Sequence, residues 1–128
     1  MDPKSLRYAA THEWASLQGD TCTIGLTKFA VDQLTDVVYI ELPDVGDHVF
    51  VNEDFGEIES VKSVNDIYSP CNGEVIAVNT KLEDDPSIIN KDPYGEGWLI
   101  KVKVEPGTSL DGMLSLADYE KQIASEGH

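Results

Sequence analysis

The chain has 128 residues, of which 41% are hydrophobic and 26% are charged; this is the size and composition of one folded domain, and it excludes a disordered chain. Nine Lys and Arg residues against 24 Asp and Glu residues give a formal net charge of −15, which repels phosphate backbones and anionic headgroups and argues against binding to nucleic acids or membrane surfaces. The longest unbroken apolar runs, such as 37–40, are far shorter than the about 20 residues that cross a bilayer, so we expect no transmembrane helix.

Most of the chain has the pattern of short strands. Alternating polar and apolar positions and β-branched side chains predict strands over 21–26, 36–42, 48–51, 55–61, 67–70, 74–78 and 98–104. The pair Asn72-Gly73 stands between the predicted strands 67–70 and 74–78, and Asn-Gly is a strong signal for a tight hairpin. We therefore expect strands 67–70 and 74–78 to pair with each other.

Two segments have helical signals. Thr27 can cap a helix over 28–34, and Ser115 with Asp118 can open a second helix over 116–124. The charged stretch 83–86 ends in proline and is expected to be a solvated surface loop. Short strands with peripheral helices predict one mainly β domain over 1–128, a small antiparallel sandwich or barrel with a short helix after the early strands and a helix at the C-terminus.

Few residues suggest catalysis. His12, His48 and His128 are too scattered for a zinc set, so no metal site is predicted, and the motifs of nucleophile elbows, P-loops and dinucleotide sites are absent from the sequence. Cys22 and Cys71 lie too far apart for a Cys-x-x-Cys motif, and we expect two reduced, partly buried thiols. A hydrolase that uses the abundant carboxylates is a weak alternative, because an acidic chain forms carboxylate pairs by chance.

The most informative side chain is Lys62. One strand-like run ends just before it and another opens shortly after it, which places Lys62 at or beside the connecting turn, the most exposed part of a hairpin. Taken alone, Lys62 could be a surface lysine that counters Glu57, Glu59 and Asp66, and such an exposed pair is worth well under about 1 kcal/mol.

The segment around Lys62 closely resembles the lipoylation hairpin of the H protein of the glycine cleavage system. The matching residues are Glu59-Ser60-Val61-Lys62-Ser63, 66–70 and 73–75. Further blocks resemble that family in the family's order, at 11–14, 24–27, 36–43 and 90–99. The resemblance covers about 8–119, and it implies the flattened β-barrel or sandwich of lipoyl domains, the barrel-sandwich hybrid fold.

The resemblance implies that Lys62 carries lipoate in an amide bond, with Glu59, Ser60, Val61 and Ser63 as the modification motif. The protein would then be a carrier without catalytic activity of its own. It would take the aminomethyl group of glycine from pyridoxal phosphate-dependent glycine decarboxylase to tetrahydrofolate-dependent aminomethyltransferase. A flavin (FAD) enzyme, dihydrolipoamide dehydrogenase, would reoxidise the arm, and a lipoate ligase or a lipoyl or octanoyl transferase would attach it.

The resemblance also implies a cleft that shelters the loaded arm from water, lined by Thr11, Glu13 and Asp66, with Glu13 as a partner for the cationic amine. From the residues alone, Glu13 could instead be an exposed charge at a strand edge. Trp14 is expected in the core, because a large aromatic after two polar residues fits an inward strand position. His12 is interpreted as structural or neutral.

The alternative function from the same resemblance is an H-like lipoyl scaffold that supplies lipoate to 2-oxo acid dehydrogenases. The chain starts with an acid and has neither an apolar signal core nor an Arg-rich transit pattern. We therefore expect a protein of the bacterial cytoplasm, or of the mitochondrial matrix if it is a processed eukaryotic chain, and we expect a monomer.

Four positions depart from the family's pattern. Lys28 and Phe29 follow Thr27, where relatives often have an acidic or polar residue and then His or another aromatic before Ala. Gln33 stands where some relatives have a histidine near the cleft, and Thr35 stands where glycine is usual. The departure at Gln33 leaves polar contacts to the arm at that position open, and the departure at Thr35 predicts an altered turn after the helix over 28–34.

Overall fold

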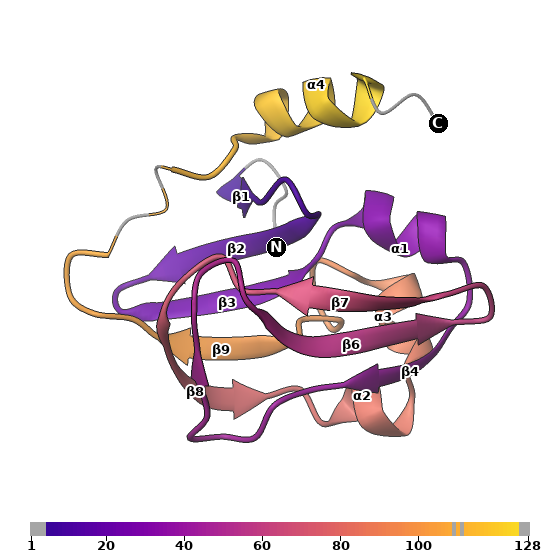
Figure 1. The fold of residues 1–128 in the computed structure, drawn as a ribbon, viewed down its shortest axis with the longest axis horizontal. Helices are drawn as coiled ribbons and strands as arrows, with labels where there is room; N and C mark the ends of the chain where they lie inside the picture. The colour runs from indigo at the N-terminus through magenta and orange to yellow at the C-terminus, as the bar shows by residue number, and fades with distance from the viewer. Residues whose placement is uncertain (1–4, 109, 111, 126–128) are drawn as a thin grey trace.

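The computed structural model describes residues 5–108, 110 and 112–125. Figure 1 shows the elements in chain order: β1 (Arg7–Tyr8), β2 (Glu13–Gln18), β3 (Thr21–Leu26), α1 (Lys28–Leu34), β4 (Val37–Glu41), β5 (His48–Val49), β6 (Asp54–Ser60), β7 (Val64–Tyr68), β8 (Gly73–Val78), α2 (Lys81–Asp84), α3 (Ser87–Lys91), β9 (Ile100–Lys103) and α4 (Leu116–Ser125).

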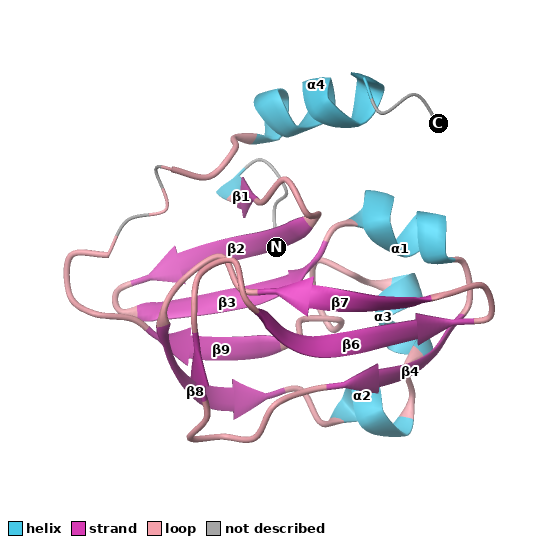
Figure 2. Ribbon diagram, viewed as in Figure 1, coloured by secondary structure: helices cyan, strands magenta, loops and turns pink. Residues whose placement is uncertain are grey.

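The strands form two antiparallel sheets. Six strands pair in the order β1-β2-β3-β9-β8-β5, and three pair in the order β4-β6-β7. Apolar side chains from both sheets, among them Ile24 and Ile100 of the larger one and Ile58 and Ile67 of the smaller one, belong to one buried cluster. Figure 2 shows the strands as the body of the molecule and the helices around its edge. The predicted flattened β sandwich is confirmed.

Both predicted helices are present with their caps. The side chain of Thr27 accepts a hydrogen bond from the backbone N–H of Ala30 at 3.2 Å and so starts α1. The Ser115 hydroxyl accepts from the N–H of Asp118 at 3.3 Å at the start of α4. A Ser or Thr oxygen satisfies one of the first helical N–H groups, which have no partner within the helix.

The surface loop predicted over 83–86 is confirmed in part: residues 83–85 are exposed and 85–86 lie outside any helix, but 83–84 belong to a helix. Two short helices, α2 and α3, occupy this region, each anchored by one fully buried side chain, Leu82 in α2 and Ile89 in α3. Pro86 separates them and lies at the N-cap of α3, a position where its fixed φ and missing N–H cost little. The two apolar side chains are buried, whereas the acidic residues at 83–85 stay at the surface, so the helices keep the charges solvated while they bury apolar area.

The prediction of a hairpin at Asn72-Gly73 is wrong. β7 pairs with β6, whereas β8 pairs with β5 and β9, so the chain passes from one sheet to the other at 69–72. The Asn72 side chain accepts a hydrogen bond from the backbone N–H of Val51 at 2.7 Å. At Gly73 a β-carbon would lie 2.3 Å from the carbonyl oxygen of Lys103, so the glycine is needed for close strand packing.

Several predicted boundaries shift. β7 begins at Val64, three residues earlier than predicted, and β9 is confined to Ile100–Lys103 within the predicted range 98–104. A second, smaller apolar cluster holds α4 against the N-terminal strands through Leu6, Tyr8, Trp14 and Tyr119. No helix in the described ranges has the length and apolar character needed to cross a membrane.

Candidate functional site

Lys62 lies in the exposed turn between β6 and β7. Glu59 pairs with Val64 in the register of the two strands, and the backbone N–H of Ser60 donates to the carbonyl oxygen of Ser63 at 2.9 Å. Val61 and Lys62 form the end of this hairpin, and both are exposed. The predicted position of Lys62 is confirmed, and the hairpin end is visible where β6 runs into β7 (Figure 1).

The hydroxyl of Ser60 holds the turn from inside. It accepts hydrogen bonds from the backbone N–H groups of Lys62 at 3.1 Å and Ser63 at 3.2 Å. The N–H of Val61 donates to the carbonyl of Asp36 at 3.1 Å, just before β4. Hydrogen bonds to the Ser60 hydroxyl and to the carbonyl of Asp36 therefore hold the backbone of the turn. The long side chain of Lys62 is exposed at its end.

The ammonium of Lys62 contacts a helix end. Its Nζ donates to the carbonyl oxygen of Gln33 in the last turn of α1 at 3.3 Å, where helix carbonyls lack partners and attract cations. In the described ranges, no carboxylate lies within 4.0 Å of Nζ. The alternative in which Lys62 counters Glu57, Glu59 or Asp66 by pairing with them is therefore wrong.

Glu13 is buried at the start of β2, with 1% of its surface exposed. Thr11 Oγ1 donates to its Oε1, and the backbone N–H of Tyr68 in β7 donates to its Oε2 at 3.2 Å. Burial raises the pKa of Glu13 to about 7, against the lowering by its hydrogen bonds. The alternative of an exposed strand-edge charge is wrong.

The structure brings together only part of the predicted cleft. Thr11 and Glu13 are hydrogen-bonded to each other, and Glu13 is tied to β7. Asp66 lies two residues before Tyr68 on that strand, so its side chain points to the same face as that of Tyr68. Asp66 is exposed, and in the part of the chain that the structure describes no hydrogen bond joins it to Thr11 or Glu13.

Trp14 confirms the prediction of a core residue. It is fully buried, and its indole N–H donates to the carbonyl oxygen of Pro93 at 3.0 Å. Its ring lies over Gly25 on the neighbouring strand, where a β-carbon would lie 2.4 Å from the ring. The blocks at 11–14, 24–27 and 90–99, distant in the sequence, thus meet at one place in the fold.

Two contacts of the site use backbone atoms and have no sequence signal. The carbonyl of Gln33 meets Lys62, and the N–H of Tyr68 meets Glu13. Every residue type supplies a backbone carbonyl, and every type except proline supplies an N–H, so only the fold can show these contacts. The departure at Gln33 from the family's pattern therefore leaves the contact with Lys62 in place.

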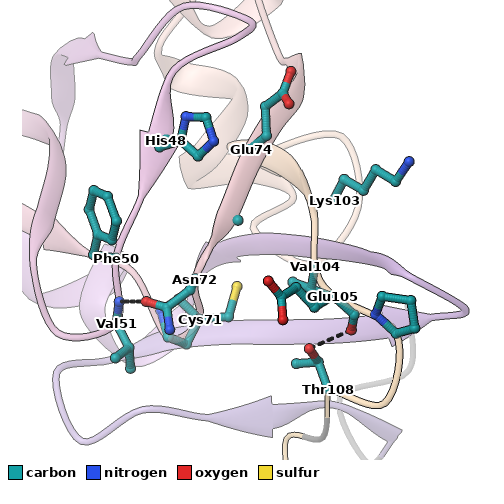
Figure 3. Close-up of a pocket in the computed structure, with 13 residues that line it drawn as sticks. His48, Phe50, Val51, Cys71, Asn72, Glu74, Lys103, Val104, Glu105 and Thr108 are labelled. Carbon is teal, nitrogen blue, oxygen red and sulfur yellow. Dashed lines mark hydrogen bonds between the residues drawn. The ribbon is translucent and has the colours of Figure 1, made fainter.

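A cavity of about 780 Å³ lies away from Lys62 and Glu13, between β5, β8 and the end of β9 (Figure 3). Phe50, Val51 and Val104 supply apolar groups there, and the polar Asn72 and Thr108 are engaged by hydrogen bonds within the protein. Its charged rim mixes both signs. Cys71 and His48 also line it, but the hydrogen bonds of Cys71 within the described residues are to Ser69, so no base is seen to activate the thiol.

The cysteines and acidic residues add no second site. Cys22 and Cys71 are both buried and unbridged. Mutual contact and burial raise the pKa of the Cys22 thiol. Among residues 5–108, 110 and 112–125, no group of three or more His, Cys, Asp or Glu side chains could hold a metal ion.

The chain resembles characterised proteins over most of its length. Residues 6–126 match the model of the glycine cleavage H-protein family. The glycine cleavage system H protein of Psychrobacter sp. (strain PRwf-1) is 47% identical over 122 residues, 94% of this chain and 97% of that protein. The H protein of Symbiobacterium thermophilum is 49% identical over 118 residues, 92% of each chain.

A solved structure agrees with these sequences. The crystal structure of a glycine cleavage system H protein from Mycobacterium marinum superposes with a TM-score of 0.87 at 36% identity, covering 96% of this chain and 99% of that one. The match to the family model extends over both the Lys62 hairpin and the Glu13 turn. The chain therefore belongs to the glycine cleavage H-protein family.

Proposed function

We propose that this protein carries lipoate on Lys62 and shuttles the aminomethyl group of glycine from glycine decarboxylase to aminomethyltransferase. Dihydrolipoamide dehydrogenase then reoxidises the arm, and a lipoate ligase or a lipoyl or octanoyl transferase attaches it. The observation that carries the proposal is an exposed amine at the tip of a rigid hairpin, in the family's modification motif.

The residues around Lys62 suit a covalently attached arm. Acylation requires a reachable amine, and the Lys62 side chain is exposed, with its Nζ bonded only to a backbone carbonyl within the described ranges. When bound, lipoate supplies a dithiolane that can be reduced and can hold a one-carbon unit on sulfur. The amide bond removes the ammonium charge, so it would move the formal net charge of −15 by one unit, to −16.

Glu13 suits the role of a partner for a cationic amine. Because burial raises the pKa of Glu13 to about 7, the carboxyl can lose its proton near neutral pH, and a cation arriving nearby favours the ionised form. Thr11 is joined to it and exposed at the surface. We propose that Thr11 and Glu13 form one wall of the arm's cleft and that Asp66, on the adjoining strand, extends it.

Glycine–bicarbonate exchange with purified glycine decarboxylase tests this function. Fully lipoylated protein should support exchange, and Lys62→Arg should not, because Arg keeps the positive charge but cannot form the same amide. The variant is a matched control for the charge at the hairpin. Absence of exchange with fully lipoylated protein would contradict the proposal. It would favour the alternative of an H-like scaffold that supplies lipoate to 2-oxo acid dehydrogenases.

A further inference from the structure

The hydroxyl of Tyr119 joins two segments that are far from it in the sequence. It lies 2.7 Å from Nδ1 of His12 and 2.7 Å from Oγ1 of Thr27. Tyr119 belongs to α4 and has 2% of its surface exposed. A tyrosine hydroxyl can donate to one partner and accept from another, so one buried group satisfies both contacts.

The first segment is the turn that presents the cleft residues. His12 stands between Thr11 and Glu13 and has a φ of 77°, a left-handed conformation that is uncommon for residues other than glycine. Its N–H donates to the carbonyl of Ala9 at 2.9 Å, and its carbonyl accepts from the N–H of Thr27 at 3.0 Å. A strained turn persists only where surrounding contacts hold it, and Tyr119 supplies one at the His12 ring.

The second segment is the start of α1. Thr27 is the N-cap of this helix, and Gln33 in its last turn meets Lys62. The seven residues of α1 rise about 10 Å, from the neighbourhood of Glu13 to that of Lys62. Figure 1 shows α1 alongside the end of the β6–β7 hairpin. The helix thus spans the region between the attachment point and the proposed cleft.

We propose that Tyr119 is a positioning residue for the lipoyl arm. Its hydroxyl joins the turn that carries Thr11 and Glu13 to Thr27, the N-cap of α1. The other end of α1 contacts Lys62. This inference rests on the proposed function. Tyr119 has no contact with the arm in this account and acts through His12 and Thr27.

Anchoring of α4 is a separate role of the same side chain. The ring of Tyr119 stacks on that of Tyr8 with centroids 4.8 Å apart and planes 8° from parallel. Gln122 adds a hydrogen bond from its side-chain amide to the carbonyl of Ala10 at 2.9 Å. Tyr119→Phe keeps the ring and removes only the hydroxyl, so it separates positioning of the cleft from anchoring of the helix.

The first test uses the protein without lipoate. In Tyr119→Phe, we expect the Glu13 carboxyl to titrate at a lower pH by NMR, because a looser turn admits water to it. We also expect amide exchange at Ala30 to accelerate about three- to tenfold, the effect of one lost hydrogen bond, with exchange at buried Val102 unchanged. Unchanged titration and exchange with α4 still docked would overturn the proposal.

The second test uses lipoylated protein loaded with the aminomethyl group. Spontaneous release of the loaded group into water should be about three- to tenfold faster in Tyr119→Phe than in the parent. Thr27→Val should reproduce this effect and Thr27→Ser, which keeps the hydroxyl, should not. Equal release rates in the parent and Tyr119→Phe would overturn the proposal.

Tyr39→Phe is a matched control, because it removes the hydroxyl of a tyrosine on β4 that is 49% exposed. Neither its Glu13 titration nor its release rate should differ from the parent, and an equal effect of this variant would overturn the specific role of Tyr119. If Lys62 is never lipoylated, the proposed function fails, whereas the measurements on unmodified protein still report on the Tyr119 contacts.

Discussion

Lys62 Nζ and the carbonyl oxygen of Gln33 lie 3.3 Å apart, so the tip of the hairpin and the end of α1 meet at the surface. The contact is exposed, and exposed charge contacts contribute little to stability. We expect Lys62→Gln to change the free energy of unfolding by less than about 0.5 kcal/mol, measured by urea denaturation. A loss of several kcal/mol would show that the lysine is structural.

The hydroxyl of Ser60 should matter for attachment of the arm. It accepts from the N–H groups of both Lys62 and Ser63, and loss of these bonds in Ser60→Ala loosens the turn that presents the amine. We expect lipoate transfer by a purified ligase to slow about two- to fivefold, measured by intact mass over time.

Ser125→Ala is the matched control for Ser60→Ala. Ser125 lies at the end of α4, outside the modification motif, and its hydroxyl donates to the carbonyl of Gln122 at 2.8 Å, so its loss leaves the turn at Lys62 in place. Ser60→Thr, which keeps the hydroxyl, should transfer lipoate as fast as the parent. Equal slowing by Ser125→Ala and Ser60→Ala would contradict a specific role of the Ser60 hydroxyl.

Glu13 should make stability depend on pH. Its pKa is raised from 4.5 to about 7 in the folded protein, so between these values the folded state keeps a proton that the unfolded chain releases. The contribution of protonated Glu13 is therefore present below pH 4.5 and is lost as pH rises to about 7, on the order of 3 kcal/mol in total.

Glu13→Gln removes this titration and keeps side-chain groups that can bond Thr11 and Tyr68. The free energy of unfolding of the variant, relative to the parent, should rise by roughly 2 to 3 kcal/mol between about pH 5 and pH 8. Urea denaturation at both pH values measures it. Parallel pH profiles of the two proteins would contradict the buried, protonated carboxyl.

Thr35 should be a strained residue. It ends α1 with a φ of 63° and a ψ of −128°, a conformation that suits glycine and not a β-branched residue. Its carbonyl accepts from the Asn90 side chain at 2.5 Å, which holds the turn. We expect Thr35→Gly to stabilise the protein by about 1 kcal/mol, seen as a higher thermal unfolding midpoint.

Thr80→Gly is the control for that substitution, because Thr80 has a φ of −65° and a ψ of −17°, which threonine adopts without strain. Here glycine should destabilise by about 1 kcal/mol through the greater freedom of the unfolded chain. A fall in the unfolding midpoint of both variants would contradict strain at Thr35.

Local patterns predicted the elements whose signals lie within a few residues. The Thr27 cap, the helix that it starts and the exposed turn at Lys62 were all predictable, because capping and strand alternation act over short range. The strand pattern also predicted a mainly β sandwich or barrel, and the family resemblance specified the lipoyl-domain type. The predicted turn after α1 is indeed unusual, because Thr35 takes the positive φ of a glycine.

Features that depend on distant partners were not predictable. Asn72-Gly73 has the composition of a hairpin, but the Asn72 side chain bonds Val51 and Gly73 packs on β9, so tertiary contacts decide its conformation. The burial of Glu13 depends on an N–H 55 residues away. The hydroxyl of Tyr119 meets His12 across 107 residues, and no local pattern connects them.

The attachment of lipoate to one lysine can be measured directly by mapping peptides by mass after coexpression with a lipoate ligase and lipoate. The chain has eight lysines, and two exposed ones are paired with carboxylates, Lys28 with Asp32 and Lys81 with Glu96. We predict one lipoyl group per chain, on Lys62 alone, and none in Lys62→Arg. A lipoyl group on another lysine, or an unmodified Lys62 under conditions that lipoylate a known H protein, would contradict the carrier account.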